Sequence, residues 1–489
     1  MLLERTGRQL LETLTFCRRY TTSLLPAGGK AFINGAWVNA ESGDTFEVRN
    51  PFNNDMLCSV AKCGIIDTEK AVKAARGALE NWSLKLTAKQ RGDLLRKWYN
   101  IYIAKQKELA ELLTLEQGKP LSESVGEIRY AAGFFDWYAG EARRIYGQIV
   151  PPTAVNRTHL HTREPIGVVA IITPWNFPSA MIARKAGAAL AVGCTLVIKP
   201  AEDTPLSALA LAQTAKEAGF PDGVFNVIPS DLKTTAEISK YICASQELLL
   251  AQSANTVKRV CLELGGNAPL VVFPSADLET AVQGAVASRF RGTGQTCISA
   301  NRLFVHSSVY DKFTSLLGNE ARKLVVGNGM KEGVTQGPLI NERAVKKIEG
   351  LVSDAVSKGA KVVCGGKRGN DSNIFEPTVI VDVQMNMDIA HTEIFGPVAS
   401  VIRFDTEEEV LKLANDTRSG LAGYIFTRDP SQIQRVTRRL QVGMVGVNTG
   451  LISCAEAAFG GVKESGLGRE GASQGIDEFS QWKYICISH

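Results

Sequence analysis

The chain has 489 residues, of which 45% are hydrophobic and 21% are charged, and its formal net charge is +5 at pH 7. This is ordinary globular composition, and the length exceeds what one hydrophobic core usually serves. We therefore expect two domains or one large α/β unit. The small net charge gives no reason to expect a nucleic-acid partner. No run approaches the roughly 18 consecutive apolar residues of a membrane span, so no membrane partner is expected.

The first 29 residues differ in composition from the rest of the chain. They combine Arg with Thr, Ser and Leu, as in "FCRRYTTSLLPAGG", before "KAFINGAWV" begins globular-looking sequence. Such a leader is typical of mitochondrial import. We therefore predict a transit peptide over 1–29 and a location in the mitochondrial matrix. Glu4 and Glu12 are unusual in such leaders, and a cytosolic N-terminal tail is the alternative.

The cysteines and histidines do not form a metal or disulfide pattern. None of the ten cysteines makes a CxxC pair, and the five histidines do not cluster with them. A zinc site or a disulfide framework is therefore not expected, and we predict no bound metal. The cysteines suit a reducing compartment, where one of them could be catalytic.

Apolar spacing predicts the secondary structure. Residues 68–142 repeat apolar positions every three or four residues and predict helices. From residue 166 apolar strand-like runs such as "IGVVAIITP" and "CTLVIKPA" alternate with helical segments, which indicates βαβ units and a doubly wound parallel sheet. A second such series begins near residue 267. We predict an α/β fold with two domains, a first one from 30–145 and 166–264 and a second one over 265–458.

Three residues could carry chemistry. Cys297 follows a glycine-rich loop in "FRGTGQTCISANR", where a thiolate would be a strong nucleophile. Glu263 ends an apolar strand in "LELGGNAP" and could act as a general base. Asn176 lies between two prolines in "TPWNFP" and could donate to an oxyanion. Each residue alone also has a plain structural interpretation: a core cysteine, a salt-bridged glutamate and an Asx turn.

Taken together, these segments resemble one family. "ITPWNFP", "VIKPAEDTPLSA", "LELGGNAP", "FRGTGQTCISANR", "EIFGPV" and "FGGVKESGLGREG" occur in the order characteristic of NAD(P)-dependent aldehyde dehydrogenases. The resemblance runs from about residue 30 to the C-terminus, and it is strongest to members that act on succinate semialdehyde. It implies a Rossmann-like NAD-binding domain, a catalytic domain and a small oligomerisation arm.

The resemblance also assigns roles. Cys297 would attack the aldehyde, Asn176 would stabilise the resulting oxyanion, and Glu263 would activate the water that hydrolyses a thioester. The cofactor-binding residues that it implies are Thr173, Trp175, Lys199, Glu202 and Glu393. A carboxylate near the adenosine 2′ position repels the extra phosphate of NADP, so Glu202 favours NAD as the cofactor.

The implied substrate and assembly follow from the same resemblance. Arg184, Arg291 and Ser453 would hold the far carboxylate of succinate semialdehyde, since guanidinium groups bind carboxylates with paired donors. Glutarate semialdehyde is one methylene longer and is the alternative substrate. Strands over 146–165 and 476–489 would join copies into a homo-oligomer, a dimer or a tetramer.

One expected segment is missing from the chain. Family members carry a strand and a loop of the form "FTGSTxxG" before "LELGG", and the helix after that loop meets the cofactor pyrophosphate. Here "ICASQELLLAQSANTVKRV" lacks them, and no glycine occurs between Val224 and Gly265. We therefore predict weak NAD binding or poor folding. A shorter isoform, a misplaced exon boundary and a non-catalytic assembly subunit are alternative interpretations.

Overall fold

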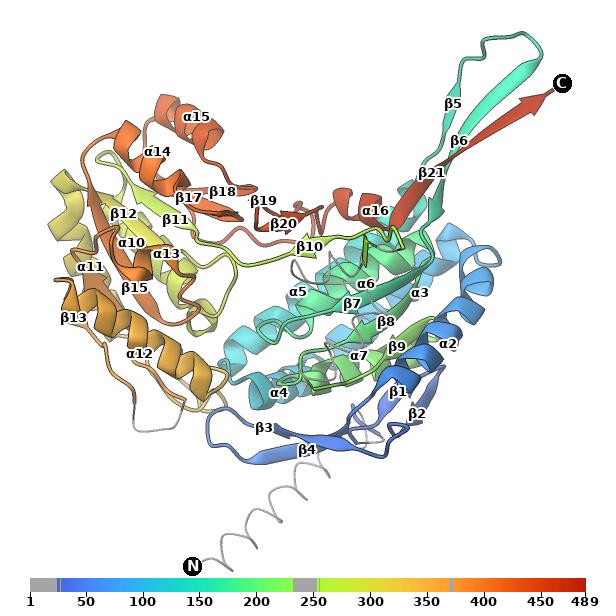
Figure 1. Ribbon diagram of the computed structural model, residues 1–489, viewed down its shortest axis with the longest axis horizontal. Helices are drawn as coiled ribbons and strands as arrows, with labels where there is room; N and C mark the ends of the chain where they lie inside the picture. The colour runs from blue at the N-terminus through green and yellow to red at the C-terminus, as the bar shows by residue number, and fades with distance from the viewer. Residues whose placement is uncertain (1–23, 27, 232–252, 255, 370–372) are drawn as a thin grey trace, which may run out of the picture.

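The computed structural model describes residues 24–26, 28–231, 253–254, 256–369 and 373–489. Two α/β domains lie side by side, and an arm of three strands extends from one of them (Figure 1). The predicted α/β class is therefore confirmed. Over the described residues, no helix is long and apolar enough to cross a membrane, and no group of His, Cys, Asp and Glu side chains could hold a metal ion.

Four helices occupy the segment over 68–142, as the apolar spacing there predicts. They are α2 (Ile65–Ser83), α3 (Ala88–Ala104), α4 (Gln106–Gln117) and α5 (Leu121–Glu141). α4 ends at Gly118, whose φ of 94° suits a glycine C-cap. Leu24 and Leu25 are buried in the core beneath these helices. The folded part of the chain thus begins before residue 30, the predicted boundary.

The first domain is built on a five-stranded sheet in the order β2-β1-β9-β8-β7. Its strands are β1 (Ala31–Ile33), β2 (Ala36–Val38), β7 (Val168–Ile172), β8 (Thr195–Lys199) and β9 (Phe225–Val227). β7, β8 and β9 are parallel and alternate with α6 (Ala180–Val192) and α7 (Pro205–Ala218). In the part of the chain that the structure describes, β7 pairs with β8 alone and is an edge strand. β3 (Thr45–Arg49) and β4 (Met56–Ala61) form a separate hairpin.

The second domain contains a seven-stranded sheet in the order β13-β14-β15-β12-β11-β17-β18. Its strands are β11 (Pro269–Val272), β12 (Arg302–His306), β13 (Lys361–Cys364), β14 (Thr378–Val381), β15 (Val398–Phe404), β17 (Ala422–Phe426) and β18 (Met444–Val447). All neighbours are parallel except β13, which runs antiparallel at one edge. The helices are α10 (Leu278–Phe290), α11 (Tyr310–Arg322), α12 (Glu342–Ser357), α13 (Asp388–His391), α14 (Glu407–Asn415) and α15 (Pro430–Arg439).

The strand that carries Glu263 differs from expectation. β10 (Leu262–Glu263) has only two residues and pairs antiparallel with β20 (Gly466–Leu467), not with the sheet of the first domain. A second short pair joins β16 (Ser419–Gly420) to β19 (Val462–Lys463), which precedes β20 in the chain. The C-terminal segment therefore holds Glu263 in place between the two domains (Figure 1).

The arm consists of β5 (Gln148–Val150), β6 (Arg157–Pro165) and β21 (Ser480–Ser488). β21 runs along all nine residues of β6, so the two ends of the predicted arm meet. The prediction of strand over 476–489 is wrong at its start, because α16 (Gln474–Phe479) packs on α6 before the strand begins. Trp482 and Tyr484 on β21 are exposed.

Candidate functional site

A cavity of about 1470 Å³ lies between the two domains. All predicted catalytic and cofactor-binding residues line it: Thr173, Trp175, Asn176, Lys199, Glu202, Glu263, Cys297 and Glu393. Several of them follow the carboxyl ends of β7 and β8, where parallel sheets gather ligand contacts. The structure therefore brings together residues that lie far apart in the sequence.

Cys297 is held by a tightly packed loop. It follows a 3-10 turn (Arg291–Gly294) in which Gly292 and Gly294 have φ of 61° and 72°. A Cβ atom on Gly294 would lie 2.2 Å from the carbonyl oxygen of Gly396. A Cβ atom on Gly266 would likewise lie 2.8 Å from the carbonyl oxygen of Cys297. These glycines let the loop approach the end of β10 closely, which sets the thiol beside Glu263.

Cys297 and Glu263 interact directly and influence each other's ionisation. Burial raises the pKa of the Cys297 thiol well above its ordinary value, and the Glu263 carboxylate raises it further. Burial also raises the pKa of Glu263, while the Arg184 charge acts in the opposite direction. Two adjacent acidic groups of this kind oppose each other's ionisation. The pair can thus move a proton between a thiol and a carboxylate.

A buried charge cluster stands behind Glu263. Arg184 Nε lies 2.5 Å from Glu470 Oε2, and Arg184 Nη2 lies 3.8 Å from Glu263 Oε2. Lys185 Nζ contacts the other Glu470 oxygen at 2.8 Å. Burial opposes ionisation of Glu470, but Arg184 and Lys185 together hold its pKa below the usual value. The guanidinium of Arg184 is therefore already neutralised by a protein carboxylate.

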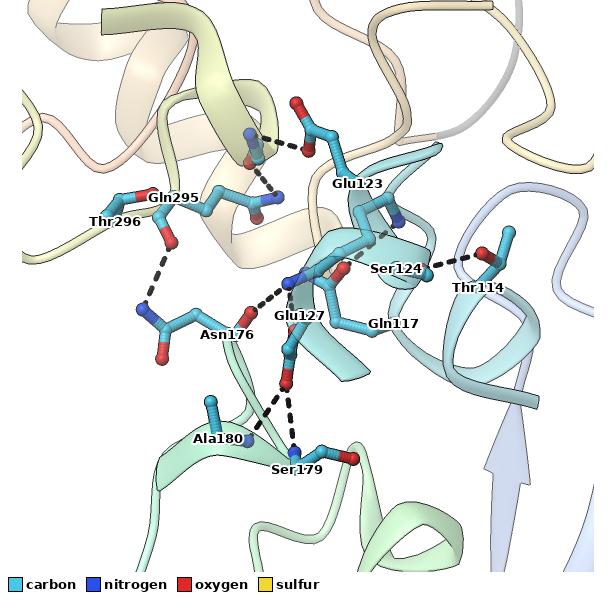
Figure 2. Close-up of polar contacts among 12 residues, drawn as sticks. Thr114, Gln117, Glu123, Ser124, Glu127, Asn176, Ser179, Ala180, Gln295 and Thr296 are labelled. Atoms are coloured by element: carbon cyan, nitrogen blue, oxygen red, sulfur yellow. Dashed lines mark hydrogen bonds and ion pairs between the residues drawn. The ribbon is translucent and has the colours of Figure 1, made fainter. Parts of the chain in front are cut away.

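Asn176 points toward the nucleophile loop. Its side chain is buried, and its Nδ2 donates to the carbonyl oxygen of Gln295 at 3.1 Å (Figure 2). The amide has a second N–H, which leaves one donor for a substrate oxygen. Gln295 is itself fixed by the N–H of Ile340, which donates to its Oε1 at 3.0 Å. The arrangement can stabilise negative charge that forms next to Cys297.

One end of the cavity is acidic around a single lysine. Lys199 Nζ lies 3.5 Å from Glu202, and the charges of Asp203 and Asp231 also act on it. Burial and Glu202 raise the pKa of Asp203 to about 6, against the charges of Arg343 and Lys199. The acidic residues follow β8 and β9 at the same edge of the sheet. The set offers acceptors for hydroxyl groups.

The other cofactor residues also fit a dinucleotide. Glu393 Oε1 accepts from the N–H of Gly266 at 3.1 Å, and burial raises the pKa of Glu393 to about 7. Trp175 packs edge-on against Phe395, with ring centroids 5.5 Å apart. Among the described residues, the buried hydroxyl of Thr173 has no hydrogen-bond partner, so it has bonding capacity left for a ligand. The donor and acceptor set therefore suits a nicotinamide cofactor.

The three predicted substrate residues are not among those that line the cavity. Arg291 lies over the Phe177 ring at 5.5 Å, and Arg184 lies over the Phe459 ring at 4.1 Å. Burial raises the pKa of Tyr130, while the charges of Arg184 and Arg291 both lower it, so Tyr130 lies near the two arginines. Ser453 lies half-buried in the loop after β18.

Sequence reasoning missed the residues that support these groups: Lys119, Glu123, Glu127, Tyr130, Phe177, Phe459 and Glu470. They come from α5 and the turn before it, from the turn before α6 and from the C-terminal segment. The glycine at 118 marks a helix end, and nothing local signals that the lysine after it is buried. Glu470 belongs to the motif "GREG", but its partner Arg184 lies far away in the sequence.

The predicted loss of the glycine loop falls on residues 232–252, which lie outside the described part of the chain. The described surroundings are nonetheless informative. All five residues of β7 line the cavity, and so does every residue from Val257 to Gly265. β7 and the segment leading to Glu263 therefore border the same space.

Comparisons with known proteins point to one family. The family model described as "Aldehyde dehydrogenase family" matches residues 37–485. The chain is similar to human mitochondrial succinate-semialdehyde dehydrogenase, with 52% identity over 93% of this chain and 88% of the relative. It is also 50% identical to the NADP(+) succinate-semialdehyde dehydrogenase of Escherichia coli and to a glutarate-semialdehyde dehydrogenase of Pseudomonas aeruginosa. Both similarities cover 94% of this chain and 97% of the relative.

Solved structures are similar over the same span. Succinate-semialdehyde dehydrogenase from Burkholderia pseudomallei superposes with a TM-score of 0.92 at 50% identity, covering 94% of this chain and 98% of that one. An aldehyde dehydrogenase from Bacillus cereus, solved as an NAD+ complex, gives a TM-score of 0.92 at 37% identity, covering 95% and 97% of the two chains.

Proposed function

Since the chain belongs to the aldehyde dehydrogenase family, we propose that it oxidises succinate semialdehyde to succinate with NAD through a thioester on Cys297. The observation that carries this proposal is the convergence of Cys297, Glu263 and Asn176 on one cavity that also contains Lys199 and Glu393. A nucleophile, a base, an oxyanion donor and acceptors for two riboses are the parts that such a reaction requires.

The chain's own residues account for the acyl chemistry. Glu263 takes the Cys297 proton as the sulfur bonds to the aldehyde carbon, and the carbonyl oxygen becomes an oxyanion next to the Asn176 amide. Loss of a hydride from that carbon leaves a thioester. Glu263 first releases the Cys297 proton to solvent and, as a carboxylate again, takes a proton from the water that attacks the thioester. The carbon–sulfur bond then breaks, the sulfur regains a proton from Glu263 as the thiol, and the acid loses its proton to solvent and leaves as a carboxylate.

The cofactor would bind across the cavity. Lys199 and Glu202 would hold the adenosine ribose, and Glu393 would hold the nicotinamide ribose. Thr173 and Trp175 would contact the part of the cofactor between the two riboses. Bound NAD supplies the acceptor for the hydride. If the glycine loop is absent, one or two charge-assisted hydrogen bonds to the pyrophosphate are lost, each worth about 1.5–3 kcal/mol. We therefore expect an NAD affinity at least about tenfold weaker than in relatives that have the loop.

Arg291 is the main candidate for binding the substrate carboxylate, with Arg184 and Ser453 as further candidates. Arg184 already pairs with Glu470, so its net attraction for another carboxylate is smaller. Relatives named for succinate semialdehyde and for glutarate semialdehyde are each 50% identical to this chain. Glutarate semialdehyde is therefore the second candidate substrate.

Replacing Arg291 with Met is expected to raise KM for succinate semialdehyde about 10- to 100-fold, because a charge-assisted contact is lost. Oxidation of propanal, which has no carboxylate, should change little. The matched control is Arg403→Met, since Arg403 also lies over an aromatic ring, Tyr310, but on β15 and away from Phe177. Equal losses with both aldehydes would argue against a carboxylate-binding role.

The preference for NAD over NADP is expected to depend on Glu202. In Glu202→Gln, kcat/KM with NADP should rise at least about tenfold, because a negative charge near the 2′ phosphate is removed. Glu217→Gln is the control, as Glu217 pairs with Lys105 at 2.8 Å outside the cavity. An unchanged ratio of NADP to NAD activity would show that the 2′ position of the adenosine ribose does not lie near Glu202.

NAD affinity is expected to increase with pH through the ionisation of Glu393. The pKa of Glu393 is raised to about 7, so the carboxyl is protonated below that pH and accepts ribose hydroxyls best above it. Between about pH 6 and 8 the dissociation constant of NAD should fall by up to about tenfold. The measurement is a binding titration at each pH, and Glu393→Gln should flatten the profile. The same slope in that variant would assign the effect to another group.

We further propose that the protein is a mitochondrial homo-oligomer. Relatives from Hylobates lar and Homo sapiens, each 52% identical to this chain, are named as mitochondrial. The arm presents exposed Trp482, Tyr484 and Ile149 on a sheet that extends away from both domains (Figure 1). Sedimentation of the purified chain tests the oligomeric state, and a monomer at micromolar concentration would contradict the role of the arm.

A further inference from the structure

A buried ion pair lies directly behind Asn176. Lys119 Nζ is 2.6 Å from Glu127 Oε2, and their side chains are 2% and 0% exposed. Burying two charges costs several kcal/mol in desolvation, so such a pair is weak evidence for stability by itself. The other contacts of the two side chains indicate what the pair does.

Each member of the pair binds one side of the Asn176 turn (Figure 2). Lys119 Nζ donates to the carbonyl oxygen of Asn176 at 2.6 Å and lies 3.9 Å from the centre of the Phe177 ring. Glu127 Oε1 accepts from the N–H groups of Ser179 and Ala180 at 2.9 and 3.2 Å. The N-cap residue of α6 makes no side-chain capping bond, so Glu127 supplies the acceptor. The turn is thereby held at both of its ends.

A second glutamate on the same helix holds the nucleophile loop. Glu123 lies four residues before Glu127 on α5, so both side chains project from one face of the helix. Its Oε2 accepts from the N–H of Gly292 at 2.8 Å (Figure 2). Gly292 is part of the left-handed turn that leads to Cys297. α5 thus contacts both partners of the oxyanion site, and the bond from Asn176 to Gln295 closes the ring of contacts.

We propose that Lys119, Glu123 and Glu127 are positioning residues that set the Asn176 amide against Cys297 when the oxyanion forms. This inference rests on the proposed thioester chemistry. Oxyanion stabilisation requires donors within a few tenths of an ångström, and a displacement of about 1 Å can cost about 100-fold in rate. The expected defect is therefore in acyl transfer and not in the reactivity of the thiol.

The test variant must keep the buried charge balanced. Lys119→Met alone would leave Glu127 buried without a partner and could unfold the chain. The double variant Lys119→Met with Glu127→Gln is neutral and keeps an oxygen for the α6 N–H groups, so it removes mainly the contact to the Asn176 carbonyl. Glu123→Ala is the second variant and removes a half-buried side chain on the loop side. Glu116→Gln is the matched control, because Glu116 is buried and caps α7 through Leu206 and Ser207.

Two assays that need no cofactor separate stabilisation of the oxyanion from the reactivity of the Cys297 thiol. Hydrolysis of p-nitrophenyl acetate passes through an oxyanion, whereas alkylation of Cys297 by iodoacetamide does not. In the double variant we expect ester hydrolysis to fall about 100-fold, with the alkylation rate and thermal midpoint close to those of Glu116→Gln. Glu123→Ala should show the same selective loss. If wild-type ester hydrolysis does not depend on Cys297, the proposed function itself fails.

The decisive comparison places the double variant in an Asn176→Ala background. Positioning through Asn176 predicts that the two effects do not add, so the combined loss stays near that of Asn176→Ala alone. Multiplied losses, equal losses in hydrolysis and alkylation, or wild-type hydrolysis in the folded variants would each overturn the proposal. Should the double variant not fold, Glu123→Ala in the same background decides by the same criteria.

Discussion

Replacing Cys297 with Ala is expected to lower kcat with succinate semialdehyde by at least about 10⁴-fold, because the group that forms the covalent intermediate is removed. The cavity should keep its shape, since the Cys297 side chain is small and its loop is fixed by close backbone contacts. Steady-state kinetics together with a titration of NAD binding would separate the loss of the nucleophile from any loss of cofactor binding. Binding should be unchanged.

Cys364→Ala is the control for that experiment. Cys364 is also half-buried, but it ends β13 at the far edge of the second sheet. Full activity is expected in this variant. If Cys297→Ala retained even a few per cent of wild-type turnover, the nucleophile would have to be another group.

Replacing Glu263 with Gln is expected to lower the steady-state rate by about 10²–10⁴-fold, the usual contribution of a general base. Without the Glu263 charge the pKa of Cys297 is lower, so the thiol can lose its proton to water and the thioester still forms. Hydrolysis of the thioester should be slowed most, so one equivalent of NADH should form per active site before turnover nearly stops. Rapid-mixing measurements of NADH absorbance would show this burst. Mass spectrometry should find the succinyl group on Cys297.

The thiol itself should also respond to Glu263→Gln. The Glu263 charge raises the pKa of Cys297, so its removal should shift the pH profile of iodoacetamide alkylation to lower pH. Glu464→Gln is the matched control, since Glu464 lines the cavity but pairs with Arg418 at the protein surface. A Glu263→Gln enzyme that lost the burst as well as turnover would indicate that Glu263 is required before the thioester forms.

Most of the fold could be predicted from the sequence because its signals are local. The buried strands β7 and β8 are continuous apolar runs, and α6 and α7 follow them at spacings typical of βαβ units. Motifs likewise located the residues that meet at the cavity. The pairing of β10 could not be predicted, because its partner β20 lies near the C-terminal end of the chain and no local pattern indicates that pairing.

The supporting residues could not be predicted for the same reason. Lys119 and Glu127 are charged residues near a helix terminus, a context in which they are usually solvated. They are buried because the turn at Asn176 and the start of α6 pack onto them. Leu24 and Leu25 were also misplaced, since they lie in the stretch predicted to be a transit peptide but are buried in the core.

NADH formation by the purified chain with succinate semialdehyde, measured over a wide range of NAD concentrations, would decide whether the site performs the proposed oxidation. We expect turnover that depends on Cys297 and, if the glycine loop is absent, a KM for NAD higher than in relatives that have it. Absence of NADH at every NAD concentration, from a folded protein whose Cys297 still hydrolyses p-nitrophenyl acetate, would contradict the proposed oxidation and leave only the acyl chemistry.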